Sequence, residues 1–361
     1  MSDNNVEVKV MMFGGRRCGK TSVLAAMQSC FEDKFGRGNL MIRTNNNKMM
    51  LKLREKRQEI ASYFHNQGKS RSFVPDSNPT GEKTEYRFNI ELKNKNTAGI
   101  VVNFIDYPGE WLNQDDKLDE LSEIMKHVHI IIIAIDAPHL MEQTGSDEED
   151  AVGQFNDNCN YSWHIGEWVK SNFSAQGDLA AKMVLFVPLK CEKYYHNGQM
   201  EILNKKIHRA YRETFNFFTN NTGQKYEVAI TPILTCGDED AGVEFDRFER
   251  DPETHEIKIN PKSGTPQKAL YIFTKKMSEP KPIYCEQPMV YTLAYVLAMV
   301  EIVMEQQKKD EGFFAGIMRF INETFFNAAS VKDFMQEQNT IKQAMKKIDH
   351  GYEIYNNPLN F

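Results

Sequence analysis

The stretch GGRRCGKT, residues 14–21, combines residue types that can hold an anion and a hard cation together. Its glycines let the backbone come close to a ligand, its lysine carries a positive charge, and its threonine offers a hydroxyl oxygen. The spacing fits the pattern G-x-x-x-x-G-K-[ST], which is typical of loops that bind nucleotide phosphates. An apolar run precedes it and a helical pattern follows, which is the context that this pattern requires.

Each part of this loop has an expected role. Backbone N–H groups of residues 16–20 and the N-terminus of the following helix would point at the β-phosphate. Lys20 would bridge β- and γ-phosphate oxygens, and the Thr21 hydroxyl would ligate Mg²⁺. The residues expected to contact the nucleotide in this loop are Gly14, Gly15, Arg16, Arg17, Cys18, Gly19, Lys20, Thr21 and Ser22.

The side chains of Arg16 and Arg17 have two interpretations. Side chains of a phosphate loop mostly point away from the phosphates, so both arginines could face solvent and only raise the local positive potential. Alternatively, Arg16 bends back to neutralise charge in the transition state, or reaches a second nucleotide across a dimer interface. Cys18 could be made reactive by the helix N-terminus and the arginines, although a small filler of the loop is the simpler interpretation.

A second group of residues lies in IDYPGEW, residues 105–111. Asp106 ends an apolar strand pattern, where a carboxylate would reach Mg²⁺ through water. Gly109 would offer an unobstructed backbone N–H to the γ-phosphate. On a strand that follows a hairpin, in a chain with a phosphate loop, D-x-x-G indicates the switch element of a GTPase rather than a kinase.

Glu110 occupies the position at which many GTPases have a glutamine that orients the attacking water. A carboxylate can position water or accept its proton, but it cannot donate a hydrogen bond to the γ-phosphate. We therefore expect slow intrinsic hydrolysis, with Lys20, Glu110 and Arg16 as the candidate catalytic side chains.

A third group, VPLKCEKYY (residues 187–195), ends a later strand pattern, where GTPases have N/T-K-x-D. Lys190 would cover the base, and Glu192 would accept hydrogen bonds from guanine N1–H and N2–H₂, a donor pair that adenine lacks. Leu189 replaces the amide or hydroxyl of that pattern, and Glu192 is one methylene longer than aspartate. Thr235 and Cys236, in LTCG, follow the last strand pattern, where GTPases present a loop of small residues to the base oxygen.

The elements that position these groups alternate between strand and helix patterns, which predicts an α/β fold with a mostly parallel, doubly wound sheet and one antiparallel hairpin strand. The predicted strands are 6–13, 84–92, 100–106, 128–136, 182–190 and 226–234, with short pieces at 255–260 and 269–275. The predicted helices are 21–35, 48–65, a polar helix ending near 127, 163–173, 200–220 and 287–308.

We predict one P-loop domain over residues 1–308, with insertions at about 36–80 and 246–284, followed by a C-terminal helical addition at 309–361. The addition includes a phenylalanine-rich segment at 313–326 with helical spacing. It would pack on its own domain or in a homodimer, or else bind an effector. Because few basic residues lie in that segment, contact with a membrane surface is the poorer alternative.

Together, the order of these motifs resembles the translation-factor-related (TRAFAC) class of P-loop GTPases. The segments DYPGEW, FVPLKCEKYY, TPILTCG and CEQPMVYTLAYVL resemble the bacterial YcjX-like and double-GTPase-type proteins. The resemblance implies a Ras-like core, Mg²⁺ with GTP or GDP, and a regulatory role. It also implies a threonine of the first switch as a further Mg²⁺ ligand: Thr80 is our choice, and Thr84 the alternative.

Composition narrows the remaining classes. With 44 basic and 50 acidic residues and a net charge of −6, the 361-residue chain has no basic excess of the kind that marks nucleic-acid binders. Its six cysteines are scattered, which indicates neither a disulfide framework nor a zinc site and favours a cytoplasmic location. The N-terminus lacks a signal-peptide pattern, and the most apolar run, 289–304, is shorter than the roughly 20 residues that a membrane span needs.

The sequence thus predicts a GTP-binding switch with slow GTPase activity, acting on a protein effector through its switches. A scaffold that binds GTP without meaningful turnover is the alternative. An ATPase or P-loop kinase is less favoured, because ATPases do not need Lys190 and Glu192, and neither the arginine-rich lid nor the acceptor pocket of a kinase can be placed in the chain.

Overall fold

The structure is a computed structural model. It describes residues 6–35, 40–44, 46–65, 72–74, 82–92, 100–142, 150–173, 182–220, 226–237, 242–275, 279–306 and 353–356. The strands are β1 (Val6–Phe13), β2 (Leu40–Arg43), β3 (Ser72–Phe73), β4 (Thr84–Leu92), β5 (Ile100–Asp106), β6 (Ile130–Asp136), β7 (Lys182–Leu189), β8 (Tyr226–Ile230), β9 (Val243–Phe248), β10 (Ala269–Phe273) and β11 (Glu353–Asn356). The helices are α1 (Lys20–Phe35), α2 (Asn47–His65), η1 (Gly109–Asn113, a 3-10 helix), α3 (Asp115–Lys126), α4 (Ala137–Met141), α5 (Asn156–Cys159), α6 (Ser162–Asn172), α7 (Glu192–His196), α8 (Met200–Ala210), α9 (Arg212–Asn220) and α10 (Gln287–Gln306).

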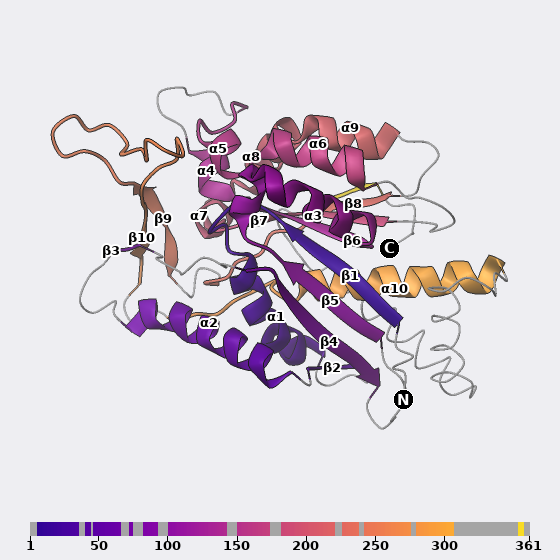
Figure 1. The fold of residues 1–361 in the computed structure, drawn as a ribbon. Helices are drawn as coiled ribbons and strands as arrows, with labels where there is room; N and C mark the ends of the chain where they lie inside the picture. The colour runs from indigo at the N-terminus through magenta and orange to yellow at the C-terminus, as the bar shows by residue number, and fades with distance from the viewer. Residues whose placement is uncertain are drawn as a thin grey trace.

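A central sheet has the strand order β11-β8-β7-β6-β1-β5-β4-β2 among the described residues (Figure 1). β1, β5, β6, β7 and β8 run parallel to one another, whereas β4 and β11 run antiparallel to their neighbours. Since the carboxyl ends of parallel strands meet at one edge, the loops after β1, β5, β6 and β7 converge there. The predicted α/β fold with a mostly parallel sheet is confirmed.

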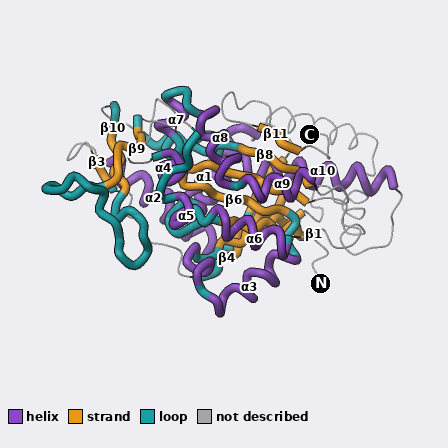
Figure 2. The backbone as a smooth tube through the Cα atoms, turned by 90° about the horizontal axis from the view of Figure 1, so that it is seen from above, coloured by secondary structure: helices purple, strands orange, loops and turns teal. Residues whose placement is uncertain are grey.

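Both faces of the sheet are buried, and alternate residues of its central strands serve separate cores. In β1, Val8, Val10 and Met12 belong to one core, whereas Met11 and Phe13 belong to the other. α1 and α10 contribute to the first core, and α3, α6, α8 and α9 to the second, as the layers in Figures 1 and 2 show. This two-sided burial explains why these strands read as nearly continuous apolar runs.

A second, three-stranded sheet has the order β3-β10-β9 and lies at the end of the molecule away from α10 (Figures 1 and 2). β3 comes from the predicted insertion at 36–80, whereas β10 and the second half of β9 come from the insertion at 246–284. Buried aromatic residues of all three strands and of α2 form its core, and they are Phe64, Phe73, Phe245, Phe248, Tyr271 and Phe273, of which Phe73 is partly buried. The two insertions therefore build one unit, which we call the insertion sheet.

Three predicted elements differ in the structure. The predicted helix 200–220 is two helices separated at Tyr211, whose ring packs edge-to-face on Phe186 of β7 at 5.3 Å, so tertiary packing overrides the helical pattern. The predicted strand 226–234 ends at Ile230, which pairs with Phe186 of β7; two residues further along β7, Pro188 has no N–H for the ladder. Residues 255–260 form isolated bridges at Ile257 and Ile259 rather than a strand.

The domain boundaries stay a prediction. Residues 353–356, within the predicted helical addition, form β11 and pair with β8 of the central sheet. The rest of that addition, including its phenylalanine-rich segment, lies outside the described residues. Within the part of the chain that the structure describes, no helix is both long and apolar enough to cross a bilayer.

Candidate functional site

Lys20 lies at the start of α1 and folds back on the loop that precedes it. Its Nζ donates hydrogen bonds to the carbonyl oxygens of Gly14 (2.9 Å) and Gly15 (3.2 Å), and the side chain is buried. Gly14 (φ +147°) and Gly19 (φ +114°) have backbone conformations that other residues rarely adopt. The loop therefore curls around its own lysine, directly before the N-terminus of α1, the end of a helix that favours anions.

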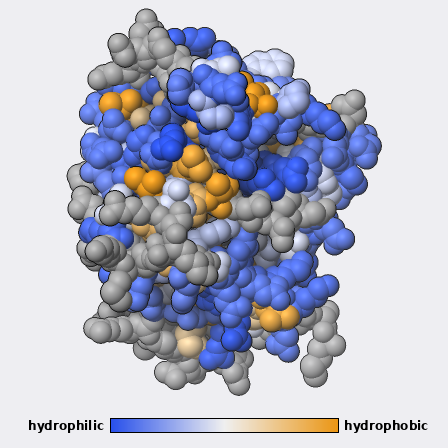
Figure 3. Space-filling model, turned by 90° about the vertical axis from the view of Figure 1, so that its left-hand side faces the viewer, coloured by the Kyte–Doolittle hydropathy of each residue, from blue (hydrophilic) through white to orange (hydrophobic). Residues whose placement is uncertain are grey.

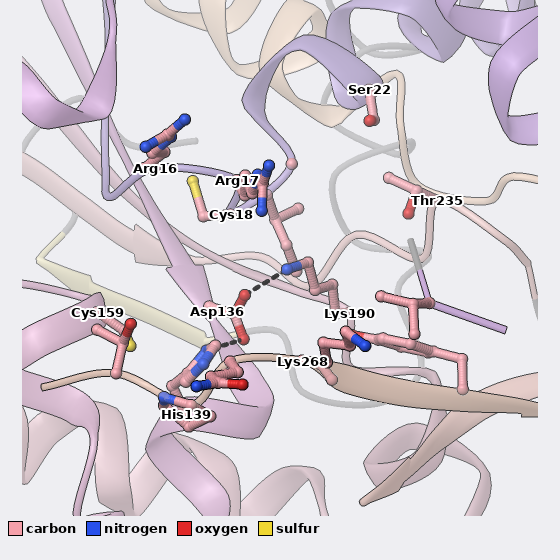
Figure 4. A pocket seen from close by; sticks show the side chains of 18 of the residues that line it. Arg16, Arg17, Cys18, Ser22, Asp136, His139, Cys159, Lys190, Thr235 and Lys268 are labelled. Carbon is pink, nitrogen blue, oxygen red and sulfur yellow. Dashed lines mark hydrogen bonds and ion pairs between the residues drawn. The ribbon is translucent and has the colours of Figure 1, made fainter. Parts of the chain in front are cut away.

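The two arginines of this loop are exposed, and both line a cavity of about 830 Å³ (Figure 4). Arg17 is in the left-handed region (φ 60°), which is uncommon for a residue with a side chain. Their exposure agrees with the solvent-facing interpretation, and a catalytic role for Arg16 stays a hypothesis. Cys18, by contrast, is buried, and burial raises the pKa of its thiol, which favours the interpretation as a loop filler.

Thr21 and Asp106 meet at the expected metal position. The Thr21 hydroxyl donates a 2.7 Å hydrogen bond to Asp106 Oδ2, and Asp106 is fully buried at the end of β5. A hydroxyl and a carboxylate are the oxygen ligands that Mg²⁺ prefers. The chemistry of these two residues fits Mg²⁺, and their assignment as metal residues stays a prediction.

Gly109 lies directly against the phosphate loop. A Cβ added to Gly109 would come 2.3 Å from the backbone nitrogen of Arg16 and 2.4 Å from the carbonyl carbon of Gly15. Because both atoms belong to the backbone, no rotation of a side chain could relieve these clashes. Glu110 follows in η1, and its Oε2 is buried with no hydrogen-bond partner in the described part of the chain. The D-x-x-G turn and the phosphate loop thus lie in direct backbone contact at Gly109, and Glu110 is the next residue along the turn.

Of the two candidate threonines of the first switch, the structure describes Thr84 only. Thr80 lies outside the described residues. Thr84 begins β4 opposite Asp106 in the antiparallel pair, and its hydroxyl donates to the carbonyl oxygen of Glu82 at 3.3 Å. Thr84 is thus the cross-strand neighbour of Asp106, but its hydroxyl donates to the backbone of its own segment.

The residues predicted to read the base also come together. Glu192 is buried at the start of α7, and its Oε1 accepts a 3.0 Å hydrogen bond from the backbone N–H of Cys236. Burial raises the pKa of Glu192 to about 7, although N–H groups of Cys236 and Thr235 partly oppose the shift. Lys190 reaches the same corner from the end of β7 in a left-handed conformation (φ 56°). We call this group, residues 190, 192, 235 and 236, the base corner.

Asp136 is a site residue that the sequence analysis missed. It ends β6, is buried, and forms ion pairs with Lys190 and with His139 (Oδ1 to Nδ1, 2.7 Å), shown as dashed lines in Figure 4. Burial opposes its ionisation, but His139 and Lys190 outweigh this and hold the pKa of Asp136 below its usual range. The available signal was an aspartate at the carboxyl end of a buried parallel strand, as at Asp106.

A further segment braces this arrangement from the side of β6. The Asn160 side chain accepts from the backbone N–H of Asp136 (2.7 Å) and donates to its carbonyl oxygen (3.2 Å). The adjacent Cys159 carbonyl oxygen lies 2.0 Å from where a Cβ of Gly15 would be. The phosphate loop is therefore held between the turn after β5 and the segment before α6.

The cavity extends from the phosphate loop to the base corner and is closed on its far side by α2 and the insertion sheet. It is lined by Arg16, Arg17, Cys18, Gly19, Ser22, Asp136, His139, Lys190, Glu192, Thr235 and Cys236 of the central domain. α2 and the insertion sheet add Lys56, Glu59, Tyr63, Phe73 and Tyr271, among others. Figure 3 views the molecule from the end at which the insertion sheet lies, and it shows a central group of apolar side chains surrounded by hydrophilic ones.

Comparisons with known proteins agree with this geometry in the N-terminal half. A family model described as Double-GTPase 2 matches residues 9–161. No curated protein matches the chain.

Among solved structures, the small GTPase Arl6 (BBS3) from Trypanosoma brucei, with the nucleotide analogue GppNp, is 9% identical over 63% of this chain and 87% of its own, with a TM-score of 0.32. The S. cerevisiae Ski7 GTPase-like domain, bound to GDP and inorganic phosphate, is 13% identical over 64% of this chain and 43% of its own, with a TM-score of 0.34. The same domain bound to GTP gives 13% identity, 70% and 47% coverage, and a TM-score of 0.33. At TM-scores this low, the fold assignment depends on the sheet order and phosphate loop of the chain itself.

Replacing Asp136 by alanine should destabilise the protein by about 3 kcal/mol, because Lys190 and His139 would be left partly buried without their counter-charge. Urea unfolding of Asp136→Ala against wild type measures this loss. Glu123→Ala is the control, since it removes an exposed carboxylate that pairs with Lys126 and His127, and it should change little. Equal, small effects of both variants would show that Asp136 does not hold the base corner together.

Proposed function

We propose that this chain, a P-loop protein of α/β fold that resembles the double-GTPase proteins, binds GTP and GDP with Mg²⁺ and hydrolyses GTP slowly, as a nucleotide-controlled switch for a protein partner. The observation that carries the proposal is that one cavity joins a phosphate loop to a corner containing Lys190 and Glu192. A phosphate site alone would suit many nucleotides. A buried carboxylate at the base position favours guanine, whose N1–H and N2–H₂ donate together.

Binding would use three parts of the site. The loop backbone and Lys20 would hold the β- and γ-phosphates, since Lys20 can exchange its bonds to the carbonyl oxygens of Gly14 and Gly15 for bonds to phosphate oxygens. Thr21 and Asp106 would hold Mg²⁺, which neutralises phosphate charge when bound. Glu192 would accept from the guanine edge, with Lys190 beside the base.

Hydrolysis requires a positioned water and positive charge near the γ-phosphate. Gly109 would offer its backbone N–H there, and the buried Oε2 of Glu110 is free to accept from the attacking water. Glu110 supplies no donor and no positive charge, which supports slow turnover. Arg16, exposed at the rim of the same loop, is the nearest candidate for the missing charge, and a partner protein is the alternative source.

The Lys20→Ala variant tests the proposed binding. Wild type should bind labelled GTP and GDP in preference to ATP, and Lys20→Ala should lose most GTP affinity because the β- and γ-phosphates lose their lysine contact. A turnover assay on the wild type follows. Preference for ATP would indicate an ATPase or kinase, and tight GTP binding without any turnover would indicate the scaffold.

The pH dependence of GTP binding tests the role of Glu192. Its raised pKa of about 7 means that acidification protonates the free site, whereas the guanine donor pair requires the carboxylate. Lowering the pH from about 8 to about 6 should therefore weaken GTP binding about tenfold. Glu192→Gln should bind more weakly at the higher pH and lose this part of the dependence. The pH profile of ATP binding is the control for titration of the phosphates, because ATP has the same phosphates. An identical pH profile of GTP binding for wild type and Glu192→Gln would contradict the assignment of Glu192 to the base.

Single-turnover hydrolysis tests the origin of the transition-state charge. Arg16→Ala should lower the hydrolysis rate about tenfold or more while GTP affinity changes little. Arg17→Ala is the matched control, because it removes the neighbouring guanidinium and keeps a non-glycine residue at φ 60°.

Equal losses of rate and affinity in Arg16→Ala would refute a catalytic role. Slow turnover itself would be refuted if wild type hydrolysed GTP rapidly and Glu110→Gln slowed it at unchanged affinity.

A further inference from the structure

Tyr271 lies in the middle strand of the insertion sheet with its ring fixed on both sides. It pairs with Phe73 of β3 and Phe245 of β9 along the two ladders. Its ring is 5.9 Å from the ring of Phe73 and 5.7 Å, edge-to-face, from that of Phe245. The register of the β9 ladder shifts between Leu270 and Tyr271, where β9 has one extra residue, Asp246. The side chain therefore has a defined direction rather than a choice of rotamers.

The hydroxyl at the end of this ring has no hydrogen-bond partner among the described residues. Tyr271 is 5% exposed, and its hydroxyl oxygen is buried without a hydrogen bond in the described part of the chain. Buried tyrosine hydroxyls usually find a partner, since an unpaired one costs free energy. A phenylalanine would fill the same aromatic core without that cost, so the hydroxyl has no use in packing.

The surroundings of Tyr271 relate it to the base corner. Tyr271 lines the same cavity as Glu192 and Cys236, the residues of the base corner. Burial raises the pKa of Tyr271 well above its usual value, and the charges of Asp136, Glu192 and Cys236 raise it further. The hydroxyl thus stays protonated, as a donor, within the electrostatic reach of the base corner rather than of the phosphate loop.

We propose that the Tyr271 hydroxyl donates a hydrogen bond to the carbonyl oxygen O6 of a bound guanine base. This inference rests on the proposed function, because it assumes that Glu192 accepts from guanine N1–H and N2–H₂. O6 is the next group along that same edge of the base, and it is an acceptor. Adenine has an amino group there, so a donor at this position adds to discrimination against adenine.

The insertion sheet then has a chemical role in the site. It brings a base-reading side chain from residues that the GTPase motifs do not include, and it closes the cavity opposite the phosphate loop. The aromatic contacts with Phe73 and Phe245 would act by positioning the Tyr271 ring and not by touching the base edge.

The test compares Tyr271→Phe with wild type for binding of GTP, ITP and ATP. Removing only the hydroxyl should weaken binding of GTP and ITP by about tenfold, because inosine keeps O6, and should leave ATP binding almost unchanged. Glu192→Gln should weaken GTP more than ITP, because inosine lacks the 2-amino group. Tyr226→Phe is the matched control, because it removes a buried hydroxyl that is bonded to the Phe173 carbonyl oxygen (3.0 Å). Tyr226 begins β8, so it lies at the amino ends of the parallel strands of the central sheet, and the change should alter no nucleotide affinity.

The outcomes separate this inference from the proposed function. If wild type prefers GTP and Tyr271→Phe binds all three nucleotides like wild type, the proposed function stands and the role of Tyr271 is overturned. An equal loss for GTP, ITP and ATP, or a lowered melting temperature with unchanged discrimination, would assign Tyr271 to packing and also overturn it. Failure of wild type to bind guanine nucleotides would overturn both.

Discussion

Three backbone contacts that exclude any Cβ hold the phosphate loop in place. Gly14 lies against the carbonyl oxygen of Ala134 in β6, Gly15 against that of Cys159, and Gly109 against the loop at Arg16. A methyl group at any of these positions would push apart the strand ends that supply Asp106 and Asp136. The position of Lys20 and the distance between Thr21 and Asp106 both depend on these close backbone contacts.

The charged and polar side chains at this edge of the sheet are arranged in two groups. Lys20, Thr21 and Asp106 lie together at the phosphate end, and Asp136, His139 and Lys190 at the base end. The second group ties the lysine of the base corner to β6. In the proposed function, this pairing would link recognition of the base to the central strand that also lies against the phosphate loop, and a bound base would meet a side chain that is already oriented.

The sequence predicted those parts of the site that depend on local pattern. Glycine spacing indicated the loop around Lys20, and an apolar run ending in an acid indicated Asp106, because strand and turn signals are short-range. Longer-range features were not predictable. The pairing of Asp136 with Lys190 joins residues 54 positions apart, and β3 is only two residues long, so no periodicity marks it. The break at Tyr211 depends on Phe186 of another strand. The choice between Thr80 and Thr84 also stays open, because Thr80 lies outside the described residues.

The insertion sheet pairs a strand at residues 72–73 with one at residues 269–273, and this separation has a consequence for how the protein is made. During synthesis, β1 and the phosphate loop emerge long before β10 exists, so β3, which carries Phe73, meets the strand that it pairs with only after the chain has passed residue 273. Closing so long a loop is slow and entropically costly, and such a contact forms late in folding. A nucleotide that contacts both the phosphate loop and the insertion sheet would therefore stabilise the last-formed part of the molecule, which couples ligand binding to completion of folding.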